Sequence, residues 1–502
     1  MARTALLTVS LDKGHRAQWA IVSLCLAAFV ATAIIAQVVL HDFPFSEDEF
    51  STLYQARLFA GGRLAADVTD EAFALNQMVL DGKLYSKYEP GWPLLLAAGV
   101  IAGLPWLVNP LIGAATLWAI YALGRRLFGE HVALGAAAVC ALSPFFLLNS
   151  ASYYSHPASL LTPVAFVLFY IRAAEGGRRV DALAAGAAIG LGLLVRPFDA
   201  FFIALPFALH AFWLAARDRG KRLPQVLLMA ATVALFAAAL LAYQRLQTGH
   251  PLVSPRTLYR DPASIGRDLP ASTRPDVSFD LREIIRLNVL GFTPLWLVRL
   301  TFWLVPLSAF FVLIALVARK ARWERLLWCS AACLAAGYML HTASGGDGYG
   351  PRYYYAALGF IALFAARGVQ AAWNWRPRLH PLVAALVVAG VALDLFLVVP
   401  ARLSVAHDVI EARSSVYRAV EAAGLHNAVV FIDADKPEHN GWFTRNDPAM
   451  SGDVIYARYL GEQATGRVMR GLPGRIAYRC CFQIGEGFPL KHTIRIRKIE
   501  QD

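Results

Sequence analysis

The sequence is poor in charged side chains for its length. Of its 502 residues, 16% are Asp, Glu, Lys or Arg, whereas 57% are hydrophobic. Soluble domains carry about 25% charged residues, so this composition excludes an ordinary soluble domain. Repeated apolar runs of roughly 18 residues or more predict instead a polytopic membrane protein.

The sequence also lacks any cysteine pattern that would bind zinc or build a disulfide framework. Four of its six cysteines fall within apolar runs, where cysteine behaves as a small core residue. Cys480 and Cys481 are adjacent and bridge poorly, and no CxxC spacing occurs. We therefore predict neither a disulfide framework nor a zinc site.

The net charge of +12 does not indicate a nucleic-acid partner. The Lys and Arg residues fall in short clusters between apolar runs, such as "RAAEGGRR" and "RDRGKR", as the positive-inside rule predicts for cytoplasmic loops. The basic stretch before the first apolar run places the N-terminus in the cytoplasm. That run, from about Gln18 to Leu40, is too long for a cleaved signal and is predicted as a retained anchor.

The apolar runs predict an all-α polytopic membrane protein with about eleven transmembrane helices. They are expected at 18–40, 108–127, 131–150, 157–173, 181–196, 198–215, 223–243, 293–318, 325–343, 354–373 and 380–400. The piece "GWPLLLAAGVIAGLPW" is too short to span and is predicted as a half-buried or re-entrant outer helix. If it crossed, every later basic cluster would lie on the wrong side of the membrane.

This topology divides the chain into two predicted domains. Residues 1–400 form the transmembrane domain of a plasma (inner) membrane protein, with outer-face loops at 41–107, 151–157, 244–292 and 344–355. Residues 401–502 contain β-branched and alternating segments between turn residues, which predicts a small soluble α/β domain on the periplasmic side. No internal repeat indicates an inverted-repeat transporter.

The first outer loop contains an acid cluster in "SEDEF". Ser46 and Glu49 have the spacing of a capping box, and an apolar stripe follows at helical spacing, which predicts an amphipathic helix along the outer interface. Capping does not account for Asp48, which projects from the polar side. Asp48 is either a solvated acid or a functional one.

A lysine follows in the same outer region, in "LYSKYEPGWPLLL". Lys87 precedes a turn that returns to apolar sequence, so an acid and a lysine are both held at the outer surface near the start of a helix. A lysine at this depth can also simply anchor the helix by extending its amine to the interface. Both interpretations stay open on the residues alone.

The ordered set of segments resembles the GT-C glycosyltransferases. It consists of a juxtamembrane "DE", then "YSKYEPGWP", "RRLFG", "SPFFLLNSASYYSHP", "GLGLLVRPFDAFFIALP" and "GPRYYYAALGFIAL". Within that class it is similar to the branch with the protein O-mannosyltransferases and the aminoarabinose transferase of lipid A. The resemblance covers residues 41 to about 370.

The resemblance implies an inverting transfer of a sugar from a polyprenyl-phosphate-linked donor to an acceptor hydroxyl. It assigns the general base to Asp48 and a contact with the donor phosphate to Lys87. The aminoarabinose transferases have two prolines directly after this lysine, whereas "KYEPGWP" stands here. The sugar (hexosyl or pentosyl) and the lipid, glycan or protein acceptor are therefore not carried over.

The chemistry of this reaction explains the residue types. One carboxylate accepts the acceptor proton, and cations stabilise the phosphate as it leaves. Arg196 in "VRPFD" and Arg352 in "GYGPRYYY" are the further phosphate-binding candidates, although Arg196 can simply pair with Asp199. Contacts with donor or acceptor are expected from Glu49, Tyr88, His156 and Tyr353. No metal ligands are predicted, and a divalent metal is not required.

Two other functions compete with the enzyme. One is a transporter or flippase of a lipid-linked saccharide. The near absence of charged residues within the spans argues against it. The other is a non-catalytic assembly protein. The long loop at 244–292 is interpreted either as an exposed loop or as a lid over an active site.

Overall fold

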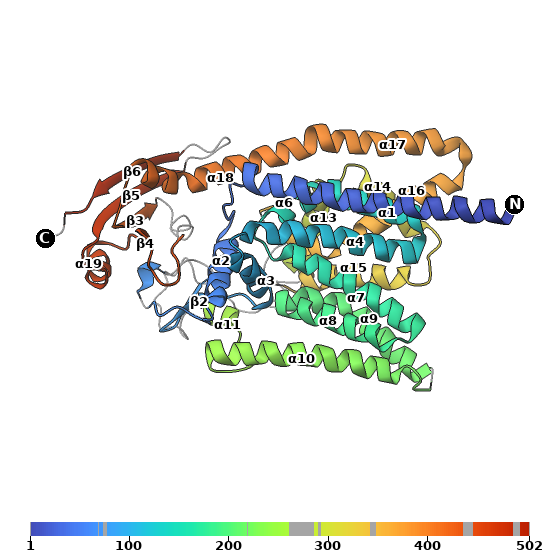
Figure 1. Cartoon of the computed structure of the whole chain (residues 1–502), viewed down its shortest axis with the longest axis horizontal. Helices are drawn as coiled ribbons and strands as arrows, with labels where there is room; N and C mark the ends of the chain where they lie inside the picture. Colours follow the sequence, from blue (N-terminus) through green and yellow to red (C-terminus); the bar gives the residue numbers. More distant parts are fainter. Residues whose placement is uncertain are drawn as a thin grey trace. The chain divides into compact units, whose positions relative to one another are not determined.

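The computed structural model describes residues 2–68, 70–73, 78–217, 219–260, 286–289, 293–341, 348–434, 445–484 and 492–500. Its chain contacts divide it into two compact units (Figure 1). The first, here called the helical unit, comprises Met1–Ile35, Leu107–Ala239 and Ser278–Arg402. The second, the mixed unit, comprises Ala36–Trp106, Leu240–Val277 and Leu403–Asp502.

The helical unit is built from long apolar helices. They are α1 (Ala2–Ile34), α4 (Val108–Phe128), α5 (Glu130–Leu142), α6 (Pro144–Ala151), α7 (His156–Gly176), α8 (Arg179–Val195), α9 (Pro197–Arg217), most of α10 (Leu223–Thr248), α13 (Thr293–Thr301), α14 (Ser308–Val317), α15 (Glu324–Met339), α16 (Leu358–Trp375) and α17 (His380–Leu393). A 3-10 turn over Arg352–Ala357 leads into α16, and a π-helical turn over Asp394–Val398 follows α17.

Every predicted span contains helix within its described residues. Among the described residues seven helices are long and apolar enough to cross a membrane, and the bent pair α5–α6 makes an eighth. The other three predicted spans are shorter or interrupted: α8 has 17 residues, α15 has 16, and 293–318 divides into α13 and α14. The chain is thus a multi-pass membrane protein, with fewer full-length spans than the eleven apolar runs suggest.

The outward surface of these helices supports a lipid environment. Large apolar side chains stay exposed along them, including Phe212 at 70%, Leu235 at 69% and Val388 at 68% exposure. In a soluble protein such surfaces would need a protein partner, whereas in a bilayer the lipid tails cover them.

Small residues allow the helices to approach closely on their inner sides. A Cβ atom added at Gly368 of α16 would lie 1.8 Å from the carbonyl oxygen of Phe311 in α14. Only glycine fits at such a contact, as is common where membrane helices pack backbone to backbone.

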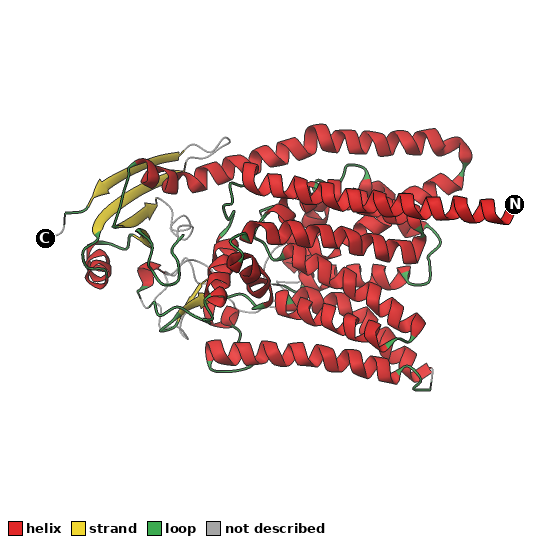
Figure 2. Ribbon diagram, viewed as in Figure 1, coloured by secondary structure: helices red, strands yellow, loops and turns green. Residues whose placement is uncertain are grey.

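The mixed unit contains all the strands that the structure describes (Figure 2). Its N-terminal part has α2 (Glu47–Ala60), the hairpin β1 (Met78–Leu80) and β2 (Leu84–Ser86), and α3 (Gly91–Ile101). A short helix, α11 (Pro255–Arg260), comes from the long loop after α10. The 11 residues of α3 agree with the short apolar piece seen in the sequence, and its re-entrant position stays a prediction.

The C-terminal part of the mixed unit is a small α/β structure. It consists of α18 (Val399–Ala422) from Leu403 onward, then β3 (Ala428–Ala434), β4 (Val454–Arg458), α19 (Glu462–Gly471), β5 (Ile476–Ile484) and β6 (His492–Lys498). The strand order is β4-β3-β5-β6, with β3 parallel to both neighbours and β6 antiparallel at the edge. The central strand β3 is almost wholly apolar and buried, as a strand covered on both faces should be.

Candidate functional site

The first turn of α2 fixes the acid cluster. The carboxylate of Glu49 accepts a hydrogen bond from the backbone N–H of Ser46 at 2.9 Å, which completes the capping box that the spacing predicts. Glu49 is only 1% exposed. Its carboxylate is used in the cap, whereas Asp48, one residue earlier, is half-buried on another side of the helix.

The polar side of α2 does not face water, contrary to the amphipathic interface helix predicted from sequence. Thr52 and Gln55 are 5% and 0% exposed. The reason is that the hairpin β1–β2 covers this side and offers hydrogen-bonding partners. Gln55 donates to the carbonyl oxygen of Leu64 at 2.8 Å and accepts from the backbone N–H of Ser86 at 3.0 Å.

Ser86, the last residue of β2, is held by α2 at two points. Besides the bond to Gln55, its hydroxyl lies 2.7 Å from the hydroxyl of Ser51, and both side chains are fully buried. The same hydroxyl accepts the backbone N–H of Tyr88 at 3.2 Å. The chain leaving β2 is therefore directed along the first turns of α2.

This arrangement brings Tyr88 to Asp48. The Tyr88 hydroxyl donates to the Asp48 carboxylate, with 2.5 Å between the oxygens, a distance typical of a charge-assisted bond. The bond joins the two segments in which the sequence placed the acid and the lysine. The "DE" and "YSKY" motifs therefore lie together in the mixed unit.

Two cations surround the same tyrosine. The Lys87 amine lies 4.3 Å from the ring centre of Tyr259 and 5.3 Å from that of Tyr88, and the Arg256 guanidinium lies 5.4 Å from the Tyr88 ring. We call these five residues the Asp48 cluster: Asp48, Lys87, Tyr88, Arg256 and Tyr259. They are all half-buried, so the cluster has one carboxylate and two cations within reach of a ligand from solvent or the interface.

Sequence reasoning did not single out Arg256 and Tyr259. Both lie on α11, in "PRTLYR", within the long loop for which an exposed loop and a lid are the two sequence-based interpretations. The available signal was a basic stretch that contains one aromatic residue, with Tyr259 between Arg256 and Arg260. The greater part of the predicted lid, 261–285 and 290–292, lies outside the described residues.

The other predicted site residues belong to the helical unit. Arg196 lies between α8 and α9 and is paired with Asp199, with 2.7 Å between Nε and Oδ2. Its Nη2 donates to the hydroxyl of Tyr338 at 3.2 Å. Tyr353 stacks on Tyr338 with ring centres 4.9 Å apart and lies 5.6 Å from the Arg196 guanidinium.

His156 and Arg352 occupy the neighbouring part of the same unit. The Arg352 guanidinium lies 4.5 Å from the ring centre of Tyr154, and the Tyr154 ring meets His156 edge to face at 5.2 Å. His156 is only 2% exposed, yet neither of its ring nitrogens has a hydrogen-bond partner among the described residues. The charges of Arg196 and Arg352 both act on this ring. We call these residues the Arg352 cluster: Tyr154, His156, Arg196, Arg352 and Tyr353.

A buried histidine without partners is costly, because each unpaired buried polar atom loses its hydration. Such a group is expected where a ligand completes the hydrogen bonding. The structure therefore gathers four of the sequence candidates (His156, Arg196, Arg352 and Tyr353) in one cationic, aromatic cluster, and three others (Asp48, Lys87 and Tyr88) in the Asp48 cluster. Glu49 alone among the candidates has a structural role in a helix cap.

The fold has known counterparts. The crystal structure of ArnT from Cupriavidus metallidurans bound to undecaprenyl phosphate matches with a TM-score of 0.53 at 12% identity, over 92% of each chain. The apo form of the same protein matches with a TM-score of 0.52 at 12% identity, over 96% of this chain and 93% of that one. The chain thus has the fold of the GT-C membrane glycosyltransferases, as the sequence motifs suggested.

A family comparison agrees with this class. Residues 105–243 match the family described as dolichyl-phosphate-mannose-protein mannosyltransferase. The archaeal oligosaccharyltransferase AglB from Archaeoglobus fulgidus is a more distant match, with a TM-score of 0.45 at 14% identity over 91% of this chain and 69% of that one. No curated protein sequence matches the chain.

The positioning role of Gln55 can be measured directly. We expect Gln55→Leu to lower the free energy of unfolding by about 2 kcal/mol, because it leaves a buried N–H at Ser86 and a carbonyl at Leu64 without this partner. Gln247→Leu is the matched control, since Gln247 also donates to Leu64 but through an exposed bond. Thermal unfolding in detergent should show a clear loss for Gln55→Leu and almost none for the control. Equal thermal midpoints for Gln55→Leu and Gln247→Leu would contradict the role of Gln55 in holding Ser86 in place.

Proposed function

We propose that the protein transfers a sugar from a polyprenyl-phosphate-linked donor to an acceptor hydroxyl on the outer side of the membrane. The observation that carries the proposal is the Asp48 cluster, in which a carboxylate is oriented by a tyrosine hydroxyl and flanked by Lys87 and Arg256. A base and cations are what an acceptor alcohol and a phosphate leaving group require.

In this proposal Asp48 is the general base. It takes the proton of the acceptor hydroxyl as the acceptor oxygen bonds to the anomeric carbon. The bond between that carbon and the phosphate oxygen breaks in the same displacement, so the configuration inverts and polyprenyl phosphate leaves with its negative charge. The hydrogen bond from Tyr88 fixes the orientation of the carboxylate, which lowers the cost of positioning it for proton transfer.

The proposal assigns the donor phosphate to the cations. Lys87 offers a compact charge, and Arg352 offers a fork that can bind two phosphate oxygens. Arg196 contributes less charge, because Asp199 already neutralises part of it. His156, buried without a hydrogen-bond partner among the described residues, is proposed to bond to the donor or the acceptor.

The comparisons support a lipid-phosphate donor of this class. The family description names a dolichyl-phosphate sugar, and the matching ArnT structure is described with undecaprenyl phosphate bound. We propose a hexosyl or pentosyl donor and a lipid, glycan or protein acceptor. We also propose that the chain lies in the inner membrane with its N-terminus in the cytoplasm and residues 401–502 on the periplasmic side.

The role of Asp48 is tested by Asp48→Asn. An amide cannot accept the proton as a carboxylate does, so we expect transfer to fall by roughly 10²-fold or more. The measurement is mass spectrometry of cell-envelope glycans, lipids and proteins from a deletion strain complemented with wild type or variant. Glu47→Gln, one residue earlier in the same helix turn, serves as the control and should restore the modification.

Three outcomes of this experiment are informative. Loss of the modification with normal protein amounts supports the enzyme. Normal transfer with a lost translocation of the lipid-linked saccharide would show a flippase instead. Normal transfer and normal translocation would overturn the role of Asp48 altogether.

The role of His156 is tested by His156→Phe. Phenylalanine keeps the ring packing against Tyr154 and Tyr355 and removes two buried nitrogens that have no hydrogen-bond partner in the described chain. We expect unchanged or higher thermal stability together with a loss of transfer. His210→Phe is the control, because His210 does bond to the Tyr170 hydroxyl, at 2.7 Å, and should lose stability but keep transfer. If His156→Phe kept full transfer activity, the role of His156 would be limited to packing, and its proposed contact with donor or acceptor would be contradicted.

A further inference from the structure

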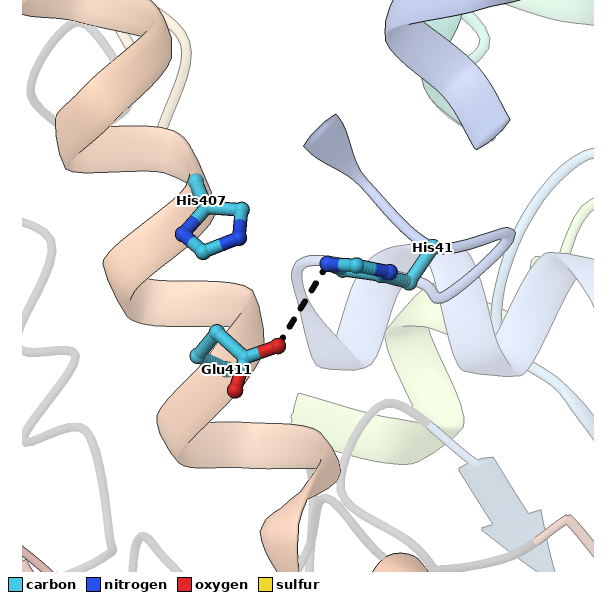
Figure 3. A group of neighbouring side chains, drawn as sticks. All are labelled: His41, His407 and Glu411. Carbon is cyan, nitrogen blue, oxygen red and sulfur yellow. Dashed lines mark ion pairs between the residues drawn. The ribbon is translucent and has the colours of Figure 1, made fainter. Parts of the chain in front are cut away.

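A group of potential metal ligands lies in the mixed unit, outside the two clusters described above. His41 follows the first span directly, and His407 and Glu411 lie on α18 (Figure 3). One ligand atom from each of the three side chains lies within 4.8 Å of the others. His41 is far from the other two residues in sequence, and the chemistry of the Asp48 cluster does not involve any of the three.

The positions on α18 have the spacing that metal sites use. His407 and Glu411 are four residues apart, so their side chains lie one above the other on the same face of the helix. Figure 3 shows both of them turned toward His41, which comes from the opposite segment. Two imidazoles and one carboxylate form the His₂Glu set that holds zinc in sites with an open position.

One pair of ligand atoms already has the separation that a tetrahedral ion requires. Ligand atoms that lie about 2.0–2.1 Å from a tetrahedral zinc ion are separated from each other by about 3.4 Å. The His41 Nε2 and Glu411 Oε1 atoms are 3.4 Å apart. The His407 ring lies 5.3 Å from the His41 ring, centre to centre, and must turn slightly inward to complete the set. Its side chain is 43% exposed, which leaves room for that rotation.

The backbone at His41 is unusual in a way that supports a site. His41 and Asp42 both have positive φ angles, 52° and 50°, a region that residues other than glycine rarely adopt. The turn is closed by a hydrogen bond from the N–H of Asp42 to the carbonyl oxygen of Ala36 at 2.9 Å. The His41 side chain lies against α18, with its Nε2 3.4 Å from Glu411 Oε1, and backbone strain of this kind collects at ligand-binding positions.

Arg418 provides support behind the carboxylate. It donates to both oxygens of Glu411, at 2.8 and 2.7 Å, which fixes the orientation of the group. An exposed ion pair of this kind contributes little stability by itself. As an outer partner of a metal ligand it would orient the carboxylate, whose Oε1 accepts from Arg418 and also lies 3.4 Å from the His41 Nε2.

We propose that His41, His407 and Glu411 bind a divalent transition-metal ion of the zinc class, with water in the fourth position. The ion would fasten the segment that follows the first span to α18. The proposal is independent of the transferase function, because binding of the ion is measured without any sugar transfer.

The experiment uses the full-length protein in detergent, with any histidine tag removed and metals stripped by a chelator. Zinc is then titrated against a chromophoric competitor at pH 7.5. We expect one site, with affinity reduced at least tenfold in each of His41→Gln, His407→Gln and Glu411→Gln. Arg418→Gln should reduce it by roughly 10-fold to 100-fold, as loss of an outer partner does.

The matched control is His426→Gln. His426 is an exposed histidine of the same unit that pairs with Asp453 at 2.6 Å, and its removal should leave zinc affinity unchanged. Added zinc should raise the thermal midpoint of the wild type and of His426→Gln, but not that of His41→Gln.

Two results would overturn the proposal. One is the absence of zinc binding by the folded wild-type protein. The other is binding that survives all three ligand substitutions with unchanged affinity, which would place the ion elsewhere on the chain. Circular dichroism of each variant shows whether it is folded, so a lost site is not confused with a lost structure.

Discussion

The attachment of Ser86 to α2 is the constraint on which the candidate site depends. Ser86 ends β2 between Ser51 and Gln55, and all three side chains are buried. Buried polar groups are expensive unless every one is paired, so this set tolerates little rearrangement. The hydrogen bonds of Ser86 with Ser51 and Gln55 determine where Tyr88 lies, and Tyr88 in turn orients Asp48. These positioning residues take no part in the proposed chemistry.

Polar residues in this membrane protein fall into two kinds: those whose hydrogen bonds are made within the protein, and those that remain able to bind a ligand. Glu49, Ser51, Gln55 and Ser86 are satisfied by each other and by backbone groups, and they position the chain. His156 is buried without such partners in the described chain, and Lys87 and Arg256 lie against the aromatic faces of Tyr259 and Tyr88. Residues of the second kind are the ones that a phosphate or a hydroxyl can engage.

Local features of this fold could be predicted from the sequence, and non-local ones could not. The capping box at Ser46 depends on residues three apart, and the helical spans depend on apolar runs, so both were found. The strand segments near 428, 454, 476 and 492 were recognised by their β-branched pattern. The pairing of Tyr88 with Asp48 and the approach of α11 depend on a hairpin register and a loop path that no spacing encodes. The approach of His41 to α18 and the sheet order β4-β3-β5-β6 are likewise non-local and could not be predicted from the sequence. The burial of Gln55 was missed because its polar side chain suggested a solvated face, whereas the hairpin covers it.

The central claim, that the Asp48 cluster receives a lipid-linked phosphate, is tested most directly by binding of undecaprenyl phosphate to the purified protein. Native mass spectrometry would measure it for the wild type, for Lys87→Gln and for Asp48→Asn. The account predicts binding that is weakened at least tenfold by Lys87→Gln and retained by Asp48→Asn, because the cation holds the phosphate and the carboxylate serves only the acceptor. Equal binding by the wild type and Lys87→Gln would contradict it.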